Sequence, residues 1–315
     1  MKIGLLTDSL GHLPFTKALD WIVDHDIDSV EISTGGFSPA PHCDLNTLVE
    51  KESARQSFLG EIDKRGVKLT ALNCNANMLD PQPERRQSAQ DVLFKTVELA
   101  PKLGVKVIGT MSGCPGDPSG SPYPNWVTFP WQPEYIEVLN WQWDTEIGPF
   151  WKKAAKHAVD HGVKIGIEAF PGQAVYNTST LRQLREVSGP SIGANFDPSH
   201  LFFQGIDPIL AVRTLGEDFI FNVHAKDTYV DPHEMAVNGA IDIRALNLVA
   251  KRSWGYRTLG HGHGEVWWQQ FVGALRMVGY NGSLTIEHED PLMSSEEGIV
   301  KSVDFLKPVV MRTLP

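Results

Sequence analysis

Short apolar runs recur along the chain, and most of them precede a segment of helical periodicity. Eight such runs, rich in Val, Ile, Leu and Thr, cover residues 2–8, 29–34, 68–75, 105–113, 163–170, 191–197, 219–227 and 283–290. Several begin just after a glycine, in the stretches RGVKLTAL, LGVKVIGT, HGVKIGIE and GYNGSLTI. Glycine readily adopts the left-handed conformation that ends a helix and leads the chain into the next strand. The pattern therefore predicts repeated strand–helix units.

Eight such units favour a single (β/α)₈ TIM barrel spanning residues 1–315, because the strands are apolar nearly throughout, as burial on both faces requires. An open doubly wound sheet is the alternative, but TDSLGH after the first strand lacks the glycine-rich phosphate-binding fingerprint. Two connections exceed ordinary barrel loops: residues 113–146 after the fourth strand and residues 226–264 after the seventh. We expect both on the active-site side, the second with a helix near residues 243–251.

Charge and composition exclude several classes of function. The net charge of −10, with no cluster of Lys and Arg, argues against a nucleic-acid partner. No apolar run approaches the roughly 18 residues of a membrane span, and MKIGLLTDSL lacks the small-residue cleavage site of a leader peptide. Cys43, Cys74 and Cys114 include no close pair. This favours inert, reduced thiols and predicts a cytoplasmic protein.

Acidic residues and histidines stand at the C-terminal ends of the last four predicted strands, which meet at one mouth in a closed barrel. Burying several carboxylates together is unfavourable unless a cation compensates their charge. The pattern therefore predicts one divalent metal ion, with an oxygen-rich shell that favours Mn²⁺ and leaves Mg²⁺, Co²⁺ and Zn²⁺ open. A hydrogen-bond network is the alternative at any single position. The predicted ligands are Glu168, Asp197, His224 and Glu287.

The order Glu, Asp-x-x-His, His, Glu at these strand ends resembles the xylose-isomerase-like barrel superfamily of sugar-phosphate isomerases and epimerases. The resemblance covers nearly the whole chain and is most specific in IEAF, NFDPSHL, VHAKD, GHGHGE and GYNGSLTIE. It implies a metal-dependent sugar isomerase or epimerase in which Glu168 and Glu287 bind the metal and also exchange protons with the sugar carbon, through an enediolate. It further implies that His200 contacts the substrate oxygen or supports the ligands.

Part of the sequence departs from the usual epimerase, which has an arginine shortly after the histidine of strand seven, where this chain reads HAKDTYVD. The Trp-rich loop, HAKDT and GHGHGE are similar to the branch that includes C-glycoside deglycosidase large subunits. That likeness implies an alternative function, a lyase that eliminates the aglycone of 3-keto-glycosides, with a small β-rich partner subunit. The candidate substrate-binding residues are Glu31, His42, Trp126, Lys226, His261 and His263.

Some of these residues have other interpretations. Lys226 could polarise a carbonyl or pair with Asp227 or Glu289, and we favour pairing. Trp residues suit sugar stacking but equally suit the interface of a homo-oligomer. Apurinic-site endonucleases share the barrel and the Asp-x-x-His pattern, and Asp231 and His233 add an Asp-x-His, but the charge of −10 opposes a phosphodiesterase. A non-catalytic sugar-binding barrel would lack a complete ligand set, which this chain has.

Overall fold

The computed structural model describes residues 1–314, whose main strands are arranged as a closed parallel barrel. The strand order is β1-β10-β7-β6-β5-β4-β3-β2. Each strand lies within one of the predicted apolar runs, so the predicted (β/α)₈ TIM barrel is confirmed. The bounds are β1 Lys2–Leu6, β2 Ser29–Ser33, β3 Lys68–Asn73, β4 Val107–Met111, β5 Lys164–Glu168, β6 Ile192–Phe196, β7 Ile220–Ala225 and β10 Ser283–Ile286.

Helices separate the strands, as the pattern predicts. Gly104 and Gly162, with φ of +73° and +67°, follow α4 and α6 in the left-handed conformation and lead into β4 and β5. The bounds are α1 Phe15–Asp24, α2 Leu45–Glu50, α3 Glu52–Asp63, α4 Pro83–Lys102, α5 Pro133–Trp141, α6 Gly148–Asp160, α7 Thr178–Ser188, α8 Ser199–Phe202, α9 Pro208–Leu215, α10 Pro232–Asn238, α11 Glu265–Met277 and α12 Ser295–Leu306. Short 3₁₀ turns occur at η1 (Thr7–Leu10) and η3 (Val249–Lys251), and a π-helical segment at η2 (Gln142–Ile147).

None of the helices in the described part of the chain combines the length and the apolar character that crossing a membrane requires.

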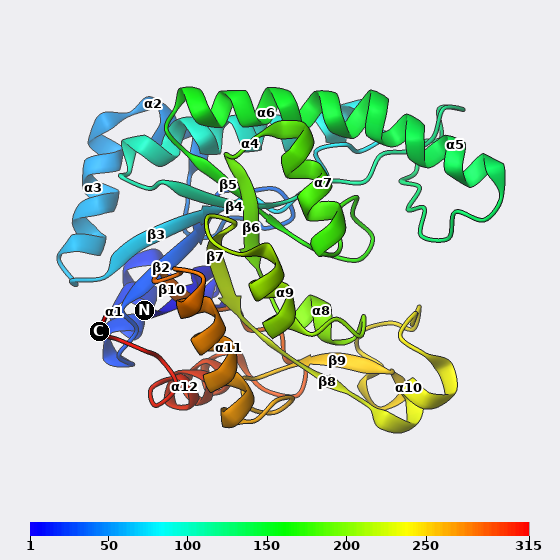
Figure 1. Cartoon of the computed structure of the whole chain (residues 1–315). Coiled ribbons are helices and arrows are strands. Elements are labelled where there is room, and N and C mark those ends of the chain that lie inside the picture. The colour runs from blue at the N-terminus through cyan, green and yellow to red at the C-terminus, as the bar shows by residue number, and fades with distance from the viewer. Residues whose placement is uncertain (315) are drawn as a thin grey trace. The chain divides into compact units, whose positions relative to one another are not determined.

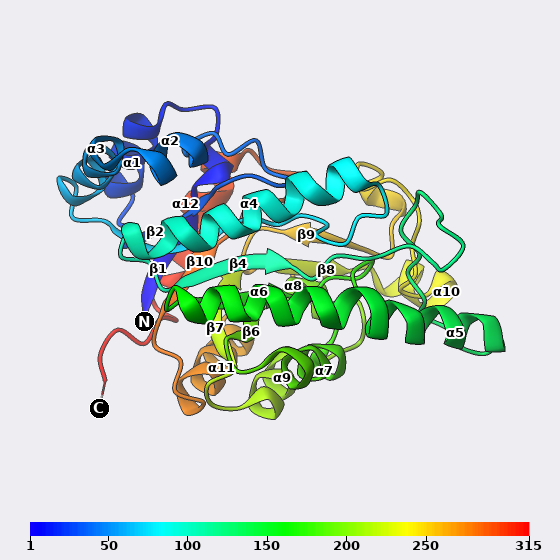
Figure 2. The same ribbon diagram turned by 90° about the horizontal axis from the view of Figure 1, so that it is seen from above.

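The chain divides into two compact units, and the second comprises residues 32–60 and 71–196. In this unit α4 and α6 pack against each other, α4 contacts β4, and α6 contacts β5. Figure 2 shows α4, β4 and α6 running alongside one another. Trp151 of α6 is completely buried, and its indole N–H donates to the Ser112 carbonyl at 3.0 Å, which ties the helix to the end of β4. The long connection expected over residues 113–146 is irregular only as far as residue 132. Helix α5 and η2 follow it and lead directly into α6.

The first unit comprises residues 1–31, 61–70 and 197–314 and carries most of the candidate site. Its connection after β7 contains an antiparallel hairpin of β8 (Asp227–Val230) and β9 (Trp254–Arg257), joined through α10 (Figure 1). The prediction of a helix near residues 243–251 is wrong, because only the η3 turn forms there. Ile243 is 97% exposed and Leu246 59%, so this stretch has no buried face on which an amphipathic helix could pack.

Candidate metal centre

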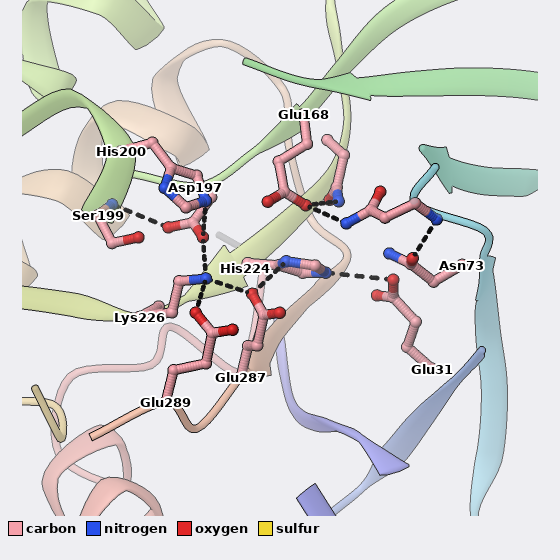
Figure 3. Close-up of polar contacts among 12 residues, drawn as sticks. Glu31, Asn73, Glu168, Asp197, Ser199, His200, His224, Lys226, Glu287 and Glu289 are labelled. Carbon is pink, nitrogen blue, oxygen red and sulfur yellow. Dashed lines mark hydrogen bonds and ion pairs between the residues drawn. The ribbon is translucent and has the colours of Figure 1, made fainter. Parts of the chain in front are cut away.

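Three of the predicted ligands lie together in the first unit. Asp197 directly follows β6, His224 lies near the end of β7, and Glu287 directly follows β10. The Glu287 N–H donates to the Ala225 carbonyl at 3.4 Å, which continues the pairing of β10 with β7. As a result, the Glu287 carboxylate reaches the buried His224 ring, with Oε2 lying 3.1 Å from Nδ1 (Figure 3).

His224 is oriented from behind by a buried carboxylate. Its Nε2 lies 3.1 Å from Glu31 Oε1 (Figure 3). The Asn222 amide donates to the other oxygen, Glu31 Oε2, at 2.7 Å. Nδ1 is therefore the ring nitrogen that faces Glu287. Burial lowers the pKa of His224, but the Glu31 and Glu287 carboxylates outweigh burial and hold that pKa well above its usual value. Glu31, which the sequence suggested as a sugar contact, thus serves to orient the imidazole.

Asp197 is buried and held by neighbours on three sides. Its Oδ1 accepts the Ser199 backbone N–H at 2.8 Å, and its Oδ2 lies 3.1 Å from His200 Nε2 and 3.1 Å from Lys226 Nζ. Burial raises the pKa of Asp197, but Lys226 and His200 together lower it well below its usual range. The Asp197 carboxylate is therefore ionised at neutral pH, as metal coordination requires.

His200 also contacts the hairpin. Its Nδ1 lies 2.9 Å from the Tyr256 hydroxyl, and Tyr256 belongs to β9. Because Nε2 faces the Asp197 carboxylate, the hydrogen-bond pattern assigns the proton to Nε2 and makes Nδ1 the acceptor of the Tyr256 O–H. His200 is completely buried.

Lys226 places a positive charge among the carboxylates. Its ammonium lies 2.7 Å from Glu287 Oε2 and 2.9 Å from Glu289 Oε2, in addition to its contact with Asp197 (Figure 3). Burial lowers the pKa of Lys226, but Asp197 and Glu287 raise it well above its usual value. Of the two partners expected from the sequence, Glu289 is the one the structure places beside Lys226, whereas Asp227 binds His263.

Glu168 ends β5 in the second unit and is 1% exposed. Its Oε2 accepts from the side-chain amides of Asn75 and Asn195, each at 3.2 Å. These two amide donors fix the orientation of the carboxylate. Neither asparagine was singled out from the sequence, although Asn195 belongs to the NFDPSHL motif.

The donor set fits a divalent ion. Within the first unit, one ligand atom from each of Asp197, His224 and Glu287 can be chosen so that the three lie within 4.8 Å of one another. Two oxygens on opposite sides of a Mg²⁺ ion lie about 4.2 Å apart, because each bond is about 2.1 Å long. Small movements of the side chains would therefore close the set around an ion. The ammonium of Lys226 already lies against two members of the set, which indicates that these oxygens attract a cation.

The remaining predicted substrate contacts lie in three separate connections of the chain. His42 is buried in the connection between β2 and α2. Trp126 is 38% exposed, packs edge-on against Tyr176 with ring centroids 5.4 Å apart, and lines a cavity of about 120 Å³ in the second unit. His261 lies exposed in the glycine-rich loop before α11.

His263, in the same glycine-rich loop, is fixed rather than flexible. Its Nδ1 lies 2.8 Å from Asp227 Oδ1, and its ring stacks on Phe202 with centroids 3.7 Å apart. Asp227 is completely buried, and its Oδ2 also accepts the backbone N–H groups of Gly260, Gly262 and His263. The carboxylate therefore holds the loop in one conformation.

Comparisons with known proteins agree with this geometry. A model of the family described as xylose isomerase-like TIM barrel matches residues 19–309. The chain is 43% identical to YfiH of Bacillus subtilis (strain 168), an uncharacterized protein, over 98% of this chain and 99% of YfiH. Among solved structures, IolI with a bound zinc atom has a TM-score of 0.67 at 17% identity, covering 98% of both chains. A D-tagatose 3-epimerase-like protein has a TM-score of 0.64 at 19% identity, again over 98% of both chains.

Proposed function

Because the chain belongs to the xylose isomerase-like TIM barrel family, we propose that it is a divalent-metal-dependent isomerase or epimerase of a sugar. The observation that carries this proposal is the cluster of Asp197, His224 and Glu287, whose ligand atoms lie within 4.8 Å of one another in the first unit; Glu168, at the end of β5, is the fourth ligand that we propose. Solved structures of this fold include a D-tagatose 3-epimerase-like protein and IolI with a bound zinc atom, which supports both parts of the proposal.

Each residue of the proposed centre has a task that follows from its contacts. Glu168, Asp197, His224 and Glu287 would hold the ion. A bound divalent cation supplies positive charge that stabilises the negative charge developing on the sugar oxygens when an adjacent C–H proton is removed. Mn²⁺ remains our preferred ion because the shell is rich in oxygen, with Mg²⁺, Co²⁺ and Zn²⁺ as alternatives.

The proton itself would be moved by carboxylates. Burial raises the pKa of Glu287, but Lys226 and His224 hold it at about 2, so this carboxylate is ionised and able to accept a proton. We assign the removal of the proton from the carbon beside the carbonyl to an oxygen of Glu287, and its return to an oxygen of Glu168. The reverse assignment serves the opposite direction, and two carboxylates on different strands permit inversion at that carbon.

His200 and Lys226 would orient the substrate. The Tyr256 hydroxyl and the Asp197 carboxylate fix the His200 ring, which leaves it no freedom to rotate. The Lys226 ammonium lies beside Glu287 and can stabilise a nearby sugar oxygen without moving far.

Deuterium exchange tests the proposal. The metal-loaded protein is incubated in D₂O with a panel of ketohexoses and ketopentoses, and mass spectrometry follows deuterium at carbon together with the formation of an isomer. We expect Glu168→Gln and Glu287→Gln to reduce exchange by at least about 100-fold, the usual contribution of a general base. Glu217→Gln, in the exposed turn before β7, is the matched control and should exchange normally. Exchange that survives in both site variants would remove these carboxylates from the mechanism.

The same assay distinguishes isomerisation from elimination. Both reactions begin with removal of the proton beside the carbonyl, but only elimination expels a group from the neighbouring carbon. When a 3-keto-glycoside is supplied, release of its aglycone would make the protein a lyase. Isomer formation without release would leave the proposed assignment in place.

A further inference from the structure

A pocket of about 300 Å³ lies in the first unit, lined by β9, the segment that leads into it and the connection after β10. Much of its wall is apolar, and a volume of this size suits a group of one or two rings. Its lining includes Leu246, Val249, Trp254, Tyr256, Arg257 and Pro291.

The pocket adjoins the metal centre through shared residues. Tyr256 lines the pocket, while its hydroxyl binds His200 Nδ1 and the Lys226 ammonium lies 4.8 Å from the centre of its ring. Glu289 also lines the pocket and binds Lys226 at 2.9 Å. A substrate held beside Lys226 could therefore extend a substituent past Tyr256 into this space.

Arg257 supplies the positive charge of the pocket. Its guanidinium donates to the Tyr256 carbonyl at 2.7 Å and lies along its own strand over Gly255, where an added Cβ would be 3.1 Å from Nη1. Among the described residues, no carboxylate lies within the 4.0 Å of an ion pair with Arg257. The two nearby acids make their close contacts elsewhere, Glu289 with Lys226 and Asp290 with the N–H and hydroxyl groups of Thr258. At longer range the Arg257 charge still contributes to the lowered pKa of Asp290.

The second arginine of the pocket differs in this respect. Arg252 is 3% exposed and stacks on Trp254 at 4.7 Å. Its guanidinium donates to the Trp254 and Arg244 carbonyls and lies 4.0 Å from Asp242. Arg252 therefore forms part of the wall. The Arg257 guanidinium contacts the Tyr256 carbonyl and lies 5.8 Å from the centre of the Tyr229 ring, and it has no ion pair among the described residues.

We propose that this pocket is a subsite for an apolar carboxylate carried by the substrate, with one or two rings against Leu246, Val249 and Pro291 and the carboxylate on Arg257. This inference rests on the proposed function, because it assigns the group to a substrate of the adjoining metal centre. An arginine without an acidic partner, set in apolar walls, binds a carboxylate strongly because its planar fork matches the two oxygens.

Binding measurements that need no turnover test the proposal. Isothermal titration of the metal-loaded protein would use 2-naphthoate as the acidic probe and 2-naphthamide as its neutral counterpart. We expect naphthoate to bind at least tenfold more tightly than the amide. Arg257→Gln should weaken naphthoate binding at least tenfold. Arg213→Gln, on the exposed end of α9, should leave it unchanged.

Gly255→Val provides a second variant that keeps the arginine. A valine suits a strand, and its side chain would displace the guanidinium from its present position, so naphthoate affinity should again fall at least tenfold. Three results would overturn the proposal: no binding of naphthoate, equal affinity for naphthoate and the amide, or naphthoate binding that persists in both variants. Persistent binding would indicate that naphthoate binds elsewhere, such as at the metal. Because no reaction is measured, failure of the deuterium-exchange assay and failure of this subsite are distinguishable.

Discussion

Replacement of Asp227 by asparagine tests how the glycine-rich loop beside the centre is held. The Asp227 carboxylate accepts five N–H groups. Oδ1 binds Thr228 N and His263 Nδ1, each at 2.8 Å, and Oδ2 binds the backbone N–H groups of Gly260, Gly262 and His263 at 3.1, 3.0 and 2.8 Å. Gly262 permits this approach, because a Cβ there would overlap the Thr228 carbonyl oxygen.

Asparagine keeps the size of the side chain but replaces one oxygen with an NH₂ donor. If its oxygen stays at the Oδ1 position, the new donor faces three backbone N–H groups. If the amide turns over, the Thr228 and His263 ring contacts are lost instead. A hydrogen bond to a charged group contributes about 1.5–3 kcal/mol, and part of the loop can turn its N–H groups to water. We therefore expect the free energy of unfolding to fall by about 3 kcal/mol.

Urea unfolding followed by tryptophan fluorescence measures this change. The matched control is Asp231→Asn. Asp231 accepts the backbone N–H groups of His233 and Glu234 as the N-cap of α10, and asparagine caps a helix as well as aspartate does. The control should stay within about 0.5 kcal/mol of the natural protein. Amide exchange over residues 258–264 should accelerate only in Asp227→Asn, and equal stabilities of the two variants would refute the reasoning.

Three further predictions concern the thiols, Lys226 and a helix end. Burial raises the pKa of Cys43, Cys74 and Cys114 from 9.0 to about 12. At pH 8 the thiols of the folded protein should therefore react with iodoacetamide roughly a thousandfold more slowly than those of the protein unfolded in urea. Equal rates would contradict the burial. Lys226→Met should destabilise the metal-free protein by about 3–5 kcal/mol, since it leaves buried carboxylates without a compensating charge. Added Mn²⁺ should restore much of this stability in a thermal melt. A melt that Mn²⁺ leaves unchanged would argue against the proposed metal site. Gly162→Ala should lower the free energy of unfolding, measured in urea, by about 1 kcal/mol, because Gly162 has a φ of +67°. An unchanged free energy would contradict the conformational argument.

The strand-forming runs and the glycines between them were sufficient to predict the barrel, because burial on both faces makes each strand visible as an apolar stretch. The residues proposed as ligands were also visible, since a charged group such as Glu168 or His224 contrasts sharply with the apolar strand that it ends. In both cases the signal is local: it lies within a few residues of one strand.

Contacts between distant segments left no comparable signal. Tyr256 reaches His200 only because the chain forms the β8–β9 hairpin, and the apolar spacing of residues 243–251 suggested a helix there instead. Glu31 and Asn222 are 191 positions apart, and their contact behind His224 follows from the closure of β1, β2, β7 and β10 into one sheet. The choice of Glu289 over Asp227 as the partner of Lys226 likewise depends on how the glycine-rich loop engages Asp227.

Metal content, measured by inductively coupled plasma mass spectrometry after dialysis, tests the central claim most directly. The natural protein and Glu217→Gln should each retain about one divalent ion per chain. Glu168→Gln, Asp197→Asn, His224→Gln and Glu287→Gln should each lose most of it, because every substitution removes one ligand. A natural protein that binds no divalent ion, or ligand variants that retain a full equivalent, would contradict the account.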